Sequence, residues 1–247
     1  MTAALNVKIV ADYAEMSRAA ADIVVETINR TPRIAISVPT GGTPVGMFDD
    51  LIADMNAGQV SFAETDIFCL DEYVGATPDD ANSLTGWLKK AFLDHIDAPV
   101  ARVHTLPSTA ADLTAAAARY EAAITTAGGL ELAVIGLGPN GHIAYNEPGS
   151  ASDSRTRVLT LTQESIAQAS GYFQGRTVRT EAMTVGVATI LEARRIVLIV
   201  SGASKADILF RALREEPTPD VPASFLQLAQ HPVLVIADRA AAARLNS

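Results

Sequence analysis

The sequence predicts an α/β fold: a doubly wound, mostly parallel sheet of the Rossmann-like type, with helices on both faces, in a single domain over residues 1–247. Two observations lead to this prediction. Short apolar runs rich in β-branched residues alternate with helical patterns along the chain, which is typical of parallel strands joined by crossover helices. Polar residues or glycines bound each apolar run, as expected for strands buried on both faces.

The predicted elements follow one another in regular order. Strands are predicted at 33–39, 65–72, 130–138, 194–202 and 231–239. Helices are predicted at 12–30, 44–58, 83–97, 112–129 and 203–216. Several of these helices end at Gly or Asn, the residues that most readily close a helix C-terminus. No linker, repeat or low-complexity tract interrupts the order, so one domain is expected.

Charge and composition narrow the classes of function. The net charge of −9 argues against nucleic acid and against an anionic membrane surface, because both are bound through basic surfaces. No apolar run approaches the roughly 20 residues that span a bilayer, and the N-terminus lacks the pattern of a signal peptide. Cys69 is the only cysteine, which leaves no internal disulfide or cysteine-based zinc site. We therefore expect a cytoplasmic protein.

Reactive residues gather in the segments that follow the predicted strands. In open α/β sheets, ligands bind beyond the carboxyl ends of the strands. The segments there read TGGTP, DEYVG, GPNGHIAYNEPG, SGASK and DRAA, and three of the five carry reactive or anion-binding groups.

Two of these segments suit an anion. Thr40, Gly41, Gly42 and Thr43 lie between a strand and a helix, where converging N–H groups and the helix dipole favour a phosphate. A tight turn with a threonine cap explains the same residues equally well. Lys205 opens a later helix, where a cation opposes the helix dipole unless an anion is nearby. A solvated surface lysine is the alternative.

Two adjacent acids, Asp71 and Glu72, end a buried strand. If the strand continues, their side chains point to opposite faces, so only one needs to face a cleft. A carboxylate there can act as a general base, a metal ligand or a helix cap. No second acidic cluster has metal-ligand spacing, so base or cap is favoured over metal.

The stretch GLGPNGHIAYNEPG, residues 136–149, begins with the glycine spacing of dinucleotide-binding sites. Such a site needs a helix of several turns after the glycines, and here Pro148 closes the segment seven residues after Gly141. His142 and Glu147 fit better as an acid–base unit, because a carboxylate orients an imidazole and stabilises its charged form. A histidine that only satisfies loop hydrogen bonds is the alternative.

Taken together, these segments resemble the glucosamine-6-phosphate deaminase (isomerase) family. The resemblance runs in order from about residue 33 to 239 and rests on PTGGTP, LDEYVG, GLGPNGHIAYNEPGS and AMTVGVATILEARRIVLIVSGASK. The sister family, the 6-phosphogluconolactonases, typically has DER in place of DEY and DGHTASLFP in place of NGHIAYNEP. Both positions favour the deaminases.

The resemblance implies an activity and a set of catalytic residues. Glucosamine 6-phosphate and water would give fructose 6-phosphate and ammonia, without a metal or an organic cofactor. His142, supported by Asn140 and Glu147, would open the sugar ring, and Asp71 would act as base at C2. Position 140 is Asp in some relatives, so Asn140 would support His142 by orientation alone.

The resemblance also implies how the phosphate is held. The Thr40–Thr43 turn and Lys205 would bind it. The family usually adds an arginine where this chain has Gly171, and Arg176 or Arg179 are the candidate replacements. A lost arginine–phosphate contact of about 1.5–3 kcal/mol is enough to redirect specificity. Galactosamine 6-phosphate as substrate and a non-catalytic sugar-phosphate sensor therefore remain alternatives, and a lactonase activity is a further alternative.

Some members of the family are activated by N-acetylglucosamine 6-phosphate, and family members range from monomer to hexamer. This chain has Ser150 and Arg157 of the activator site but Leu159 where activated members have lysine. We therefore predict no such activation. The expected partner is a small amino-sugar phosphate, and the sequence leaves the oligomeric state open.

Overall fold

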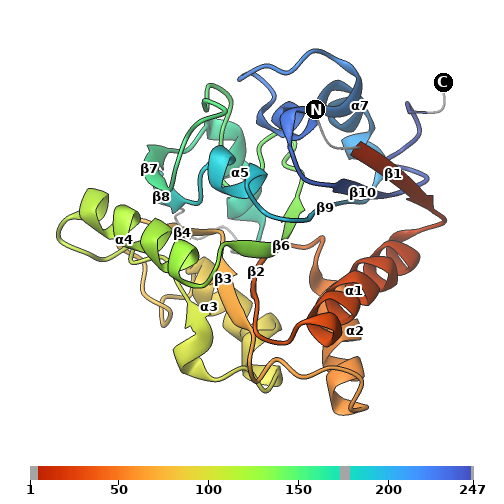
Figure 1. Cartoon of the computed structure of the whole chain (residues 1–247). Helices are drawn as coiled ribbons and strands as arrows, with labels where there is room; N and C mark the ends of the chain where they lie inside the picture. The colour runs from red at the N-terminus through yellow and green to blue at the C-terminus, as the bar shows by residue number, and fades with distance from the viewer. Residues whose placement is uncertain (1–4, 173–178, 246–247) are drawn as a thin grey trace.

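The computed structural model describes residues 5–172 and 179–245. Its main sheet has seven parallel strands in the order β1-β10-β9-β6-β2-β3-β5. From the neighbouring strands β6 and β2, the sheet extends through β9 and β10 to β1 on one side and through β3 to β5 on the other (Figure 1). The strands are β1 (Leu5–Val10), β2 (Ala35–Val38), β3 (Asp66–Cys69), β5 (Val103–His104), β6 (Leu130–Gly136), β9 (Ile196–Val200) and β10 (Val233–Asp238). The predicted fold class is confirmed, and four of the five predicted strands, those at 33–39, 130–138, 194–202 and 231–239, each correspond to one strand of this sheet.

Helices cover the sheet on both sides. They are α1 (Tyr13–Arg30), α2 (Val45–Asn56), α3 (Leu84–Ala91), α4 (Leu113–Thr126), α5 (Gln163–Tyr172), α6 (Val187–Leu191) and α7 (Ala206–Arg214), with 3-10 turns at Leu93–His95, Val100–Arg102, Ala203–Lys205 and Pro222–Leu228. Figure 1 shows α1 and α2 on one side and α7 on the other. Among the described residues, no helix is long and apolar enough to cross a membrane.

The first helix shows how local sequence sets these boundaries. The Asp12 side chain accepts a hydrogen bond from the Glu15 N–H (3.0 Å), and Glu15 Oε2 accepts one from the Ala11 N–H (2.9 Å). This reciprocal cap satisfies two backbone donors at the start of α1. Met16, Ala20 and other apolar residues of one face then pack into the core. The helix predicted at 83–97 is shorter than expected, because Phe92 leaves the helical conformation (φ −147°, ψ −59°).

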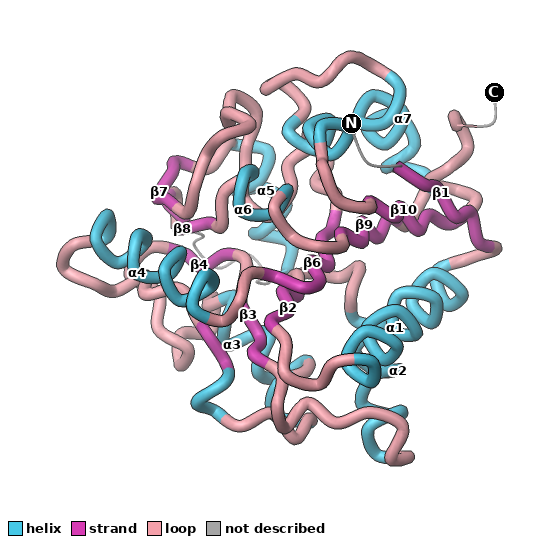
Figure 2. Tube along the Cα trace, viewed as in Figure 1, coloured by secondary structure: helices cyan, strands magenta, loops and turns pink. Residues whose placement is uncertain are grey.

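A second, smaller sheet was not predicted. Its antiparallel strands are β4 (Asp71–Tyr73), β8 (Glu181–Thr184) and β7 (Arg157–Thr160), in that order. The strand predicted at 65–72 is therefore two strands: β3 ends at Cys69 in the main sheet, and β4 pairs with β8 in the second. Figure 2 shows β4, β7 and β8 grouped beside the end of β3. This change of sheet carries Asp71 to the carboxyl edge of the main sheet.

The main core lies between the parallel sheet and its helices. Every residue of β2 and of β9 is buried, which is why β9 appears in the sequence as a continuous apolar run and β2 as a run broken only by Ser37. A small second cluster joins the antiparallel sheet to α3 and α5; its buried members are Tyr73, Ala76, Leu84, Leu161, Ala169 and Ala182. The edge strands β1 and β5 were missed in the sequence: β1 is half-exposed along its length, and β5 has only two residues.

Candidate active site

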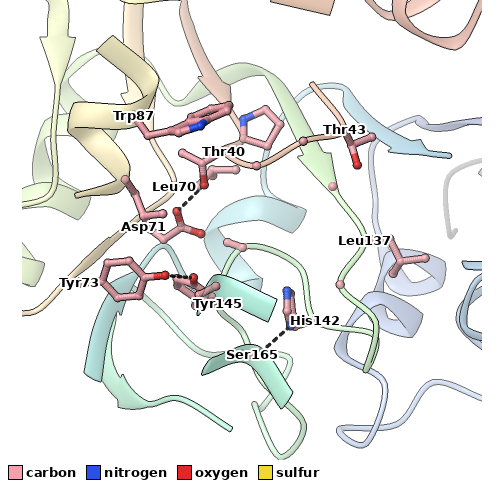
Figure 3. A pocket seen from close by; sticks show the side chains of 18 of the residues that line it. Thr40, Thr43, Leu70, Asp71, Tyr73, Trp87, Leu137, His142, Tyr145 and Ser165 are labelled. Atoms are coloured by element: carbon pink, nitrogen blue, oxygen red, sulfur yellow. Dashed lines mark hydrogen bonds between the residues drawn. The ribbon is translucent and has the colours of Figure 1, made fainter. Parts of the chain in front are cut away.

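A pocket opens at the carboxyl ends of β2, β3 and β6, beside the start of α7 (Figure 3). Residues from four of the predicted segments line it together. They are Thr40, Gly41, Gly42, Thr43, Asp71, His142 and Lys205, and they share the lining with Tyr73, Leu84, Trp87, Ala144, Tyr145 and Ser165. Segments up to 165 residues apart in the sequence thus meet at the sheet edge where the sequence places the chemistry.

Asp71 is a buried carboxylate on the pocket wall. Burial raises its pKa to about 7, and the neighbouring charge of Glu72 adds to this, against a hydrogen bond from Thr40. That bond runs from Thr40 Oγ1 to Asp71 Oδ1 (3.3 Å). A carboxylate with a pKa near neutrality can both take and return a proton at physiological pH.

Glu72 points the other way and caps a helix. Its two carboxylate oxygens accept hydrogen bonds from Ser83 Oγ (2.7 Å) and from the N–H groups of Tyr73, Leu84 and Thr85. The last two N–H groups belong to the first turn of α3, where a carboxylate also complements the helix dipole. The sequence leaves open whether these acids act as a general base or as a helix cap. In the structure Glu72 is the cap, and Asp71 faces the pocket.

His142 faces the pocket with one ring nitrogen and the protein with the other. Its Nδ1 lies 3.5 Å from Glu147 Oε2 and 3.3 Å from Ser165 Oγ. A carboxylate accepts only, so it favours the tautomer with the proton on Nδ1. The ring nitrogen that points into the pocket in Figure 3 is then Nε2, with a lone pair that can accept a proton.

Glu147 is held by a dense set of donors. Burial alone would raise its pKa, but hydrogen bonds with His142, Ser165 and Asn140 outweigh burial and hold the pKa at about 2. Asn140 Nδ2 donates to Glu147 Oε2 (2.8 Å), and the Thr162 N–H donates to Glu147 Oε1 (3.1 Å). Asn140 thus orients the Glu147 carboxylate and not the imidazole ring. Its Oδ1 accepts a hydrogen bond from the backbone N–H of His142 (3.2 Å).

Thr162 and Ser165 were missed in the sequence analysis. Thr162 Oγ1 accepts from the Ser165 N–H (3.2 Å), the pattern of a residue that caps a helix, and α5 begins at Gln163. A threonine followed by Glu164 in the first turn was the available signal. The start of α5 therefore supports the His142–Glu147 pair.

The glycine-rich loop after β6 has a packing role. A Cβ on Gly138 would lie 2.2 Å from His142 Nε2, so only glycine lets the imidazole lie against the strand end. Ala144 has φ +48°, a conformation that costs a non-glycine residue on the order of 1–3 kcal/mol and is concentrated at functional sites. No helix follows Gly141 before α5, so the loop lacks the geometry of a dinucleotide site.

The Thr40–Thr43 turn presents donors without partners. Among the described residues, none hydrogen-bonds to the backbone N–H of Gly41, Gly42 or Thr43. The following helix α2 has no side-chain cap at its N-terminus. Lys205, which also lines the pocket, donates from Nζ to the Leu137 carbonyl (2.8 Å), and burial lowers the pKa of its amine, opposed by Glu164. Unpaired N–H donors, a helix N-terminus and an ammonium together suit an anion.

Aromatic side chains lie on both sides of Asp71 in the pocket. Tyr73 and Tyr145 share a hydrogen bond between their hydroxyls (2.6 Å), and their rings are 5.7 Å apart. Figure 3 shows this pair below Asp71 and Trp87 above it. The pocket therefore offers polar hydroxyls beside the carboxylate and an apolar face beyond it.

Arg179, one of the two candidate arginines, is not among the residues that line the pocket. Arg179 donates to the Val74 carbonyl (3.1 Å) and to Asp80 Oδ2 (3.3 Å), neither of which is a lining residue. Arg176 lies outside the described residues. Gly171 falls near the end of α5. Among the residues the structure describes, no three His, Cys, Asp or Glu side chains are grouped as a metal site requires.

Arg157, which with Ser150 matches the activator site of some family members, binds side chains of this chain. Its guanidinium donates to Asn146 Oδ1 (2.9 Å) and to Ser150 Oγ (2.8 Å). Burial lowers its pKa. Absence of activation by N-acetylglucosamine 6-phosphate stays a prediction.

Such a fold and pocket define an α/β enzyme that moves protons on a small anionic substrate. A family model described as glucosamine-6-phosphate isomerases/6-phosphogluconolactonase matches residues 11–235. The chain belongs to this family.

Individual relatives match over nearly the full length. A protein of Rhodopirellula baltica named glucosamine-6-phosphate deaminase is 43% identical over 98% of this chain and 96% of its own. One of the same name from Shouchella clausii is 38% identical, with 96% of each chain covered. A solved structure described as a monomeric glucosamine-6-phosphate deaminase superposes with a TM-score of 0.93 at 37% identity, covering 96% of this chain and 99% of that one. The 6-phosphogluconolactonase of Trypanosoma brucei, at 21% identity and a TM-score of 0.75 over 99% of this chain and 100% of its own, shares the fold.

Proposed function

We propose that the chain converts glucosamine 6-phosphate and water to fructose 6-phosphate and ammonia. The observation that carries this proposal is a single pocket that holds Asp71, with a pKa of about 7, together with the His142–Glu147 pair. Full-length relatives that bear the name glucosamine-6-phosphate deaminase support it.

Substrate binding begins with the phosphate. The free N–H groups of the Thr40–Thr43 turn and the ammonium of Lys205 offer charge-assisted hydrogen bonds to its oxygens. The N-terminus of α2 adds a favourable dipole. Held at this end, the sugar extends towards Asp71 and His142 across the pocket.

Ring opening is the step we assign to His142. Its Nε2 takes the proton of the C1 hydroxyl as the bond between C1 and the ring oxygen breaks, and it then returns the proton to that oxygen. The imidazolium formed in between is stabilised by the adjacent Glu147 carboxylate. The product of this step is the open-chain aldehyde.

Isomerisation is the step we assign to Asp71. Its carboxylate takes the proton from C2, which gives an enolate with the amine still on C2, and it delivers that proton to C1 while a proton of the amine passes to the C1 oxygen. The resulting imine at C2 adds water and releases ammonia, leaving the ketone. Burial of Asp71 places its pKa where both halves of this transfer proceed.

A comparison of substrates tests the proposal. Purified protein is incubated with glucosamine 6-phosphate, galactosamine 6-phosphate and 6-phosphogluconolactone, and ammonia, ketose phosphate and acid are measured. We expect ammonia and fructose 6-phosphate in equal amounts from the first. Faster hydrolysis of the lactone would identify a lactonase, and preference for the second sugar would correct the substrate. Tight binding without turnover of any of them would indicate a sensor.

The activity should depend on pH through Asp71. Its carboxylate must be ionised to accept the C2 proton, and burial raises its pKa to about 7. We therefore expect kcat/KM to rise with pH through about 7 and then to level off, since the acid limb of kcat/KM reports the free enzyme. A limb near the ordinary pKa of aspartate, about 4, would contradict this assignment.

Lys205 should matter for binding more than for chemistry. Removing a charge-assisted contact costs about 1.5–3 kcal/mol. For Lys205→Met we expect KM for glucosamine 6-phosphate to rise roughly 10- to 150-fold while kcat changes little. Lys89→Met, an exposed lysine in the last turn of α3, is the control. A similar rise in both variants would show a general charge effect.

For the working unit we propose a monomer in the cytoplasm. The solved relative at 37% identity is described as monomeric, and the single cysteine, Cys69, is buried as a thiol.

A further inference from the structure

Tyr13, which does not line the pocket, holds the phosphate turn from behind. Its hydroxyl donates to the Gly42 carbonyl (3.3 Å) and accepts a hydrogen bond from the Gly46 N–H (2.8 Å). Gly42 belongs to the turn and Gly46 to the first turn of α2. One side chain at the start of α1 therefore ties together the two backbone segments that frame the anion site.

The contact between α1 and α2 is close at this point. A Cβ on Gly46 would lie 3.0 Å from the Tyr13 ring and 2.5 Å from Ser17 Oγ. The absence of a side chain at Gly46 lets the helices meet there and fixes the position of the Tyr13 hydroxyl.

The direction of the peptide after Gly42 follows from this contact. In a trans peptide the C=O of one residue and the N–H of the next point in opposite directions, and the described chain contains no cis peptide. The Gly42 carbonyl points to Tyr13 on α1, so the Thr43 N–H points away from α1. Thr43 lines the pocket, and its N–H has no partner among the described residues.

We propose that Tyr13 is a positioning residue: its hydroxyl fixes the Gly42–Thr43 peptide so that an N–H, and not a carbonyl, faces the phosphate. Without the hydroxyl, the Gly42 carbonyl loses this partner, and glycine at position 42 tolerates the change in ψ that accompanies rotation of the peptide. Rotation would place a carbonyl oxygen towards the phosphate oxygens, which repel it. The proposal rests on the phosphate site assigned above.

The test is direct binding to the Tyr13→Phe variant, which keeps the ring and loses only the hydroxyl. Calorimetry measures Kd for inorganic phosphate and for fructose 6-phosphate. We expect both Kd values to rise about 3- to 30-fold, as for the loss of one or two hydrogen bonds. KM for glucosamine 6-phosphate should rise by a similar factor, with kcat and the melting temperature little changed.

Glu15→Ala is the matched control, because it removes a hydrogen bond to the Ala11 N–H at the same end of α1 without touching the turn. An unchanged Kd in Tyr13→Phe, or an equal rise in Glu15→Ala, would overturn the proposal. If Tyr13→Phe weakens phosphate binding as expected but the wild-type protein releases no ammonia, the proposed reaction alone is contradicted. A wild-type protein that binds neither ligand would overturn both.

Discussion

Asp71→Asn should lower kcat by roughly 10²- to 10⁴-fold, the usual contribution of a positioned general base. The amide has the shape of the carboxylate and can still accept from Thr40 Oγ1, but it does not take up the C2 proton. Because the phosphate contacts lie elsewhere in the pocket, KM should change little. Steady-state assays of ammonia release from glucosamine 6-phosphate measure both constants.

The same variant should be more stable than the wild type, which separates lost chemistry from lost folding. The pKa of Asp71 is raised by folding from 3.8 to about 7, so the folded state binds the proton more tightly. Stability is then lost as pH rises from about 4 to 7 and stays reduced above 7. Asparagine removes this penalty, so its advantage in unfolding free energy should grow over that range to a few kcal/mol, at ~1.4 kcal/mol per pKa unit.

Glu72→Gln is the control for Asp71→Asn, because it changes the neighbouring acid. An amide oxygen replaces a carboxylate that accepts four hydrogen bonds, so the fold should lose at least about 1.5–3 kcal/mol. The folded enzyme should keep its turnover. The charge of Glu72 helps to raise the pKa of Asp71, so the acid limb of kcat/KM should move to lower pH. Loss of turnover in Glu72→Gln alone would reverse the assigned roles.

His142→Gln should lower kcat by a similar factor, roughly 10²- to 10⁴-fold, for a different reason. Glutamine can reach towards the sugar but does not carry a proton from the C1 hydroxyl to the ring oxygen. Turnover then depends on the slow, spontaneous opening of the ring. The variant should also retain its affinity for fructose 6-phosphate, since the Thr40–Thr43 turn is unchanged.

Isotope effects distinguish the two variants. With glucosamine 6-phosphate deuterated at C2, turnover by Asp71→Asn should be slower than with the unlabelled substrate, because cleavage of the bond at C2 limits the rate of this variant. His142→Gln should show no effect, because ring opening precedes that bond cleavage. Full turnover in His142→Gln, or an isotope effect confined to it, would contradict the assignment of ring opening to His142.

The sequence predicts most of the central sheet because strands buried on both faces appear as short runs of apolar residues. Strands β2 and β9 are buried at every residue, and their runs, apolar except for Ser37, are visible without a structure. The antiparallel sheet is different. Its strand β7 is partly exposed, and β4 continues a run that starts in the main sheet, so no local pattern marks the change of partner after Cys69.

The roles of some site residues follow from their place directly after a strand, and the roles of others depend on contacts with residues distant in the sequence. The glycine turn, Asp71, His142 and Lys205 follow strands, and the geometry of a parallel sheet brings strand ends together. The role of Glu72 depends on the start of α3, eleven residues later at Ser83, and that of Tyr13 on a contact 29 residues away. Such contacts leave no periodic trace in the sequence, and only the packed structure reveals them.

The most direct test of the account is the fate of hydrogen at C1 and nitrogen at C2 in one reaction. Protein and glucosamine 6-phosphate are mixed in D₂O, and the products are followed by NMR with a parallel assay for ammonia. We predict fructose 6-phosphate and ammonia in equal amounts, with solvent deuterium at C1 wherever the Asp71 carboxyl exchanges before it delivers its proton, and formation of both products roughly 10²- to 10⁴-fold slower with Asp71→Asn. Ammonia without ketose phosphate, or equal product formation by Asp71→Asn, would contradict it.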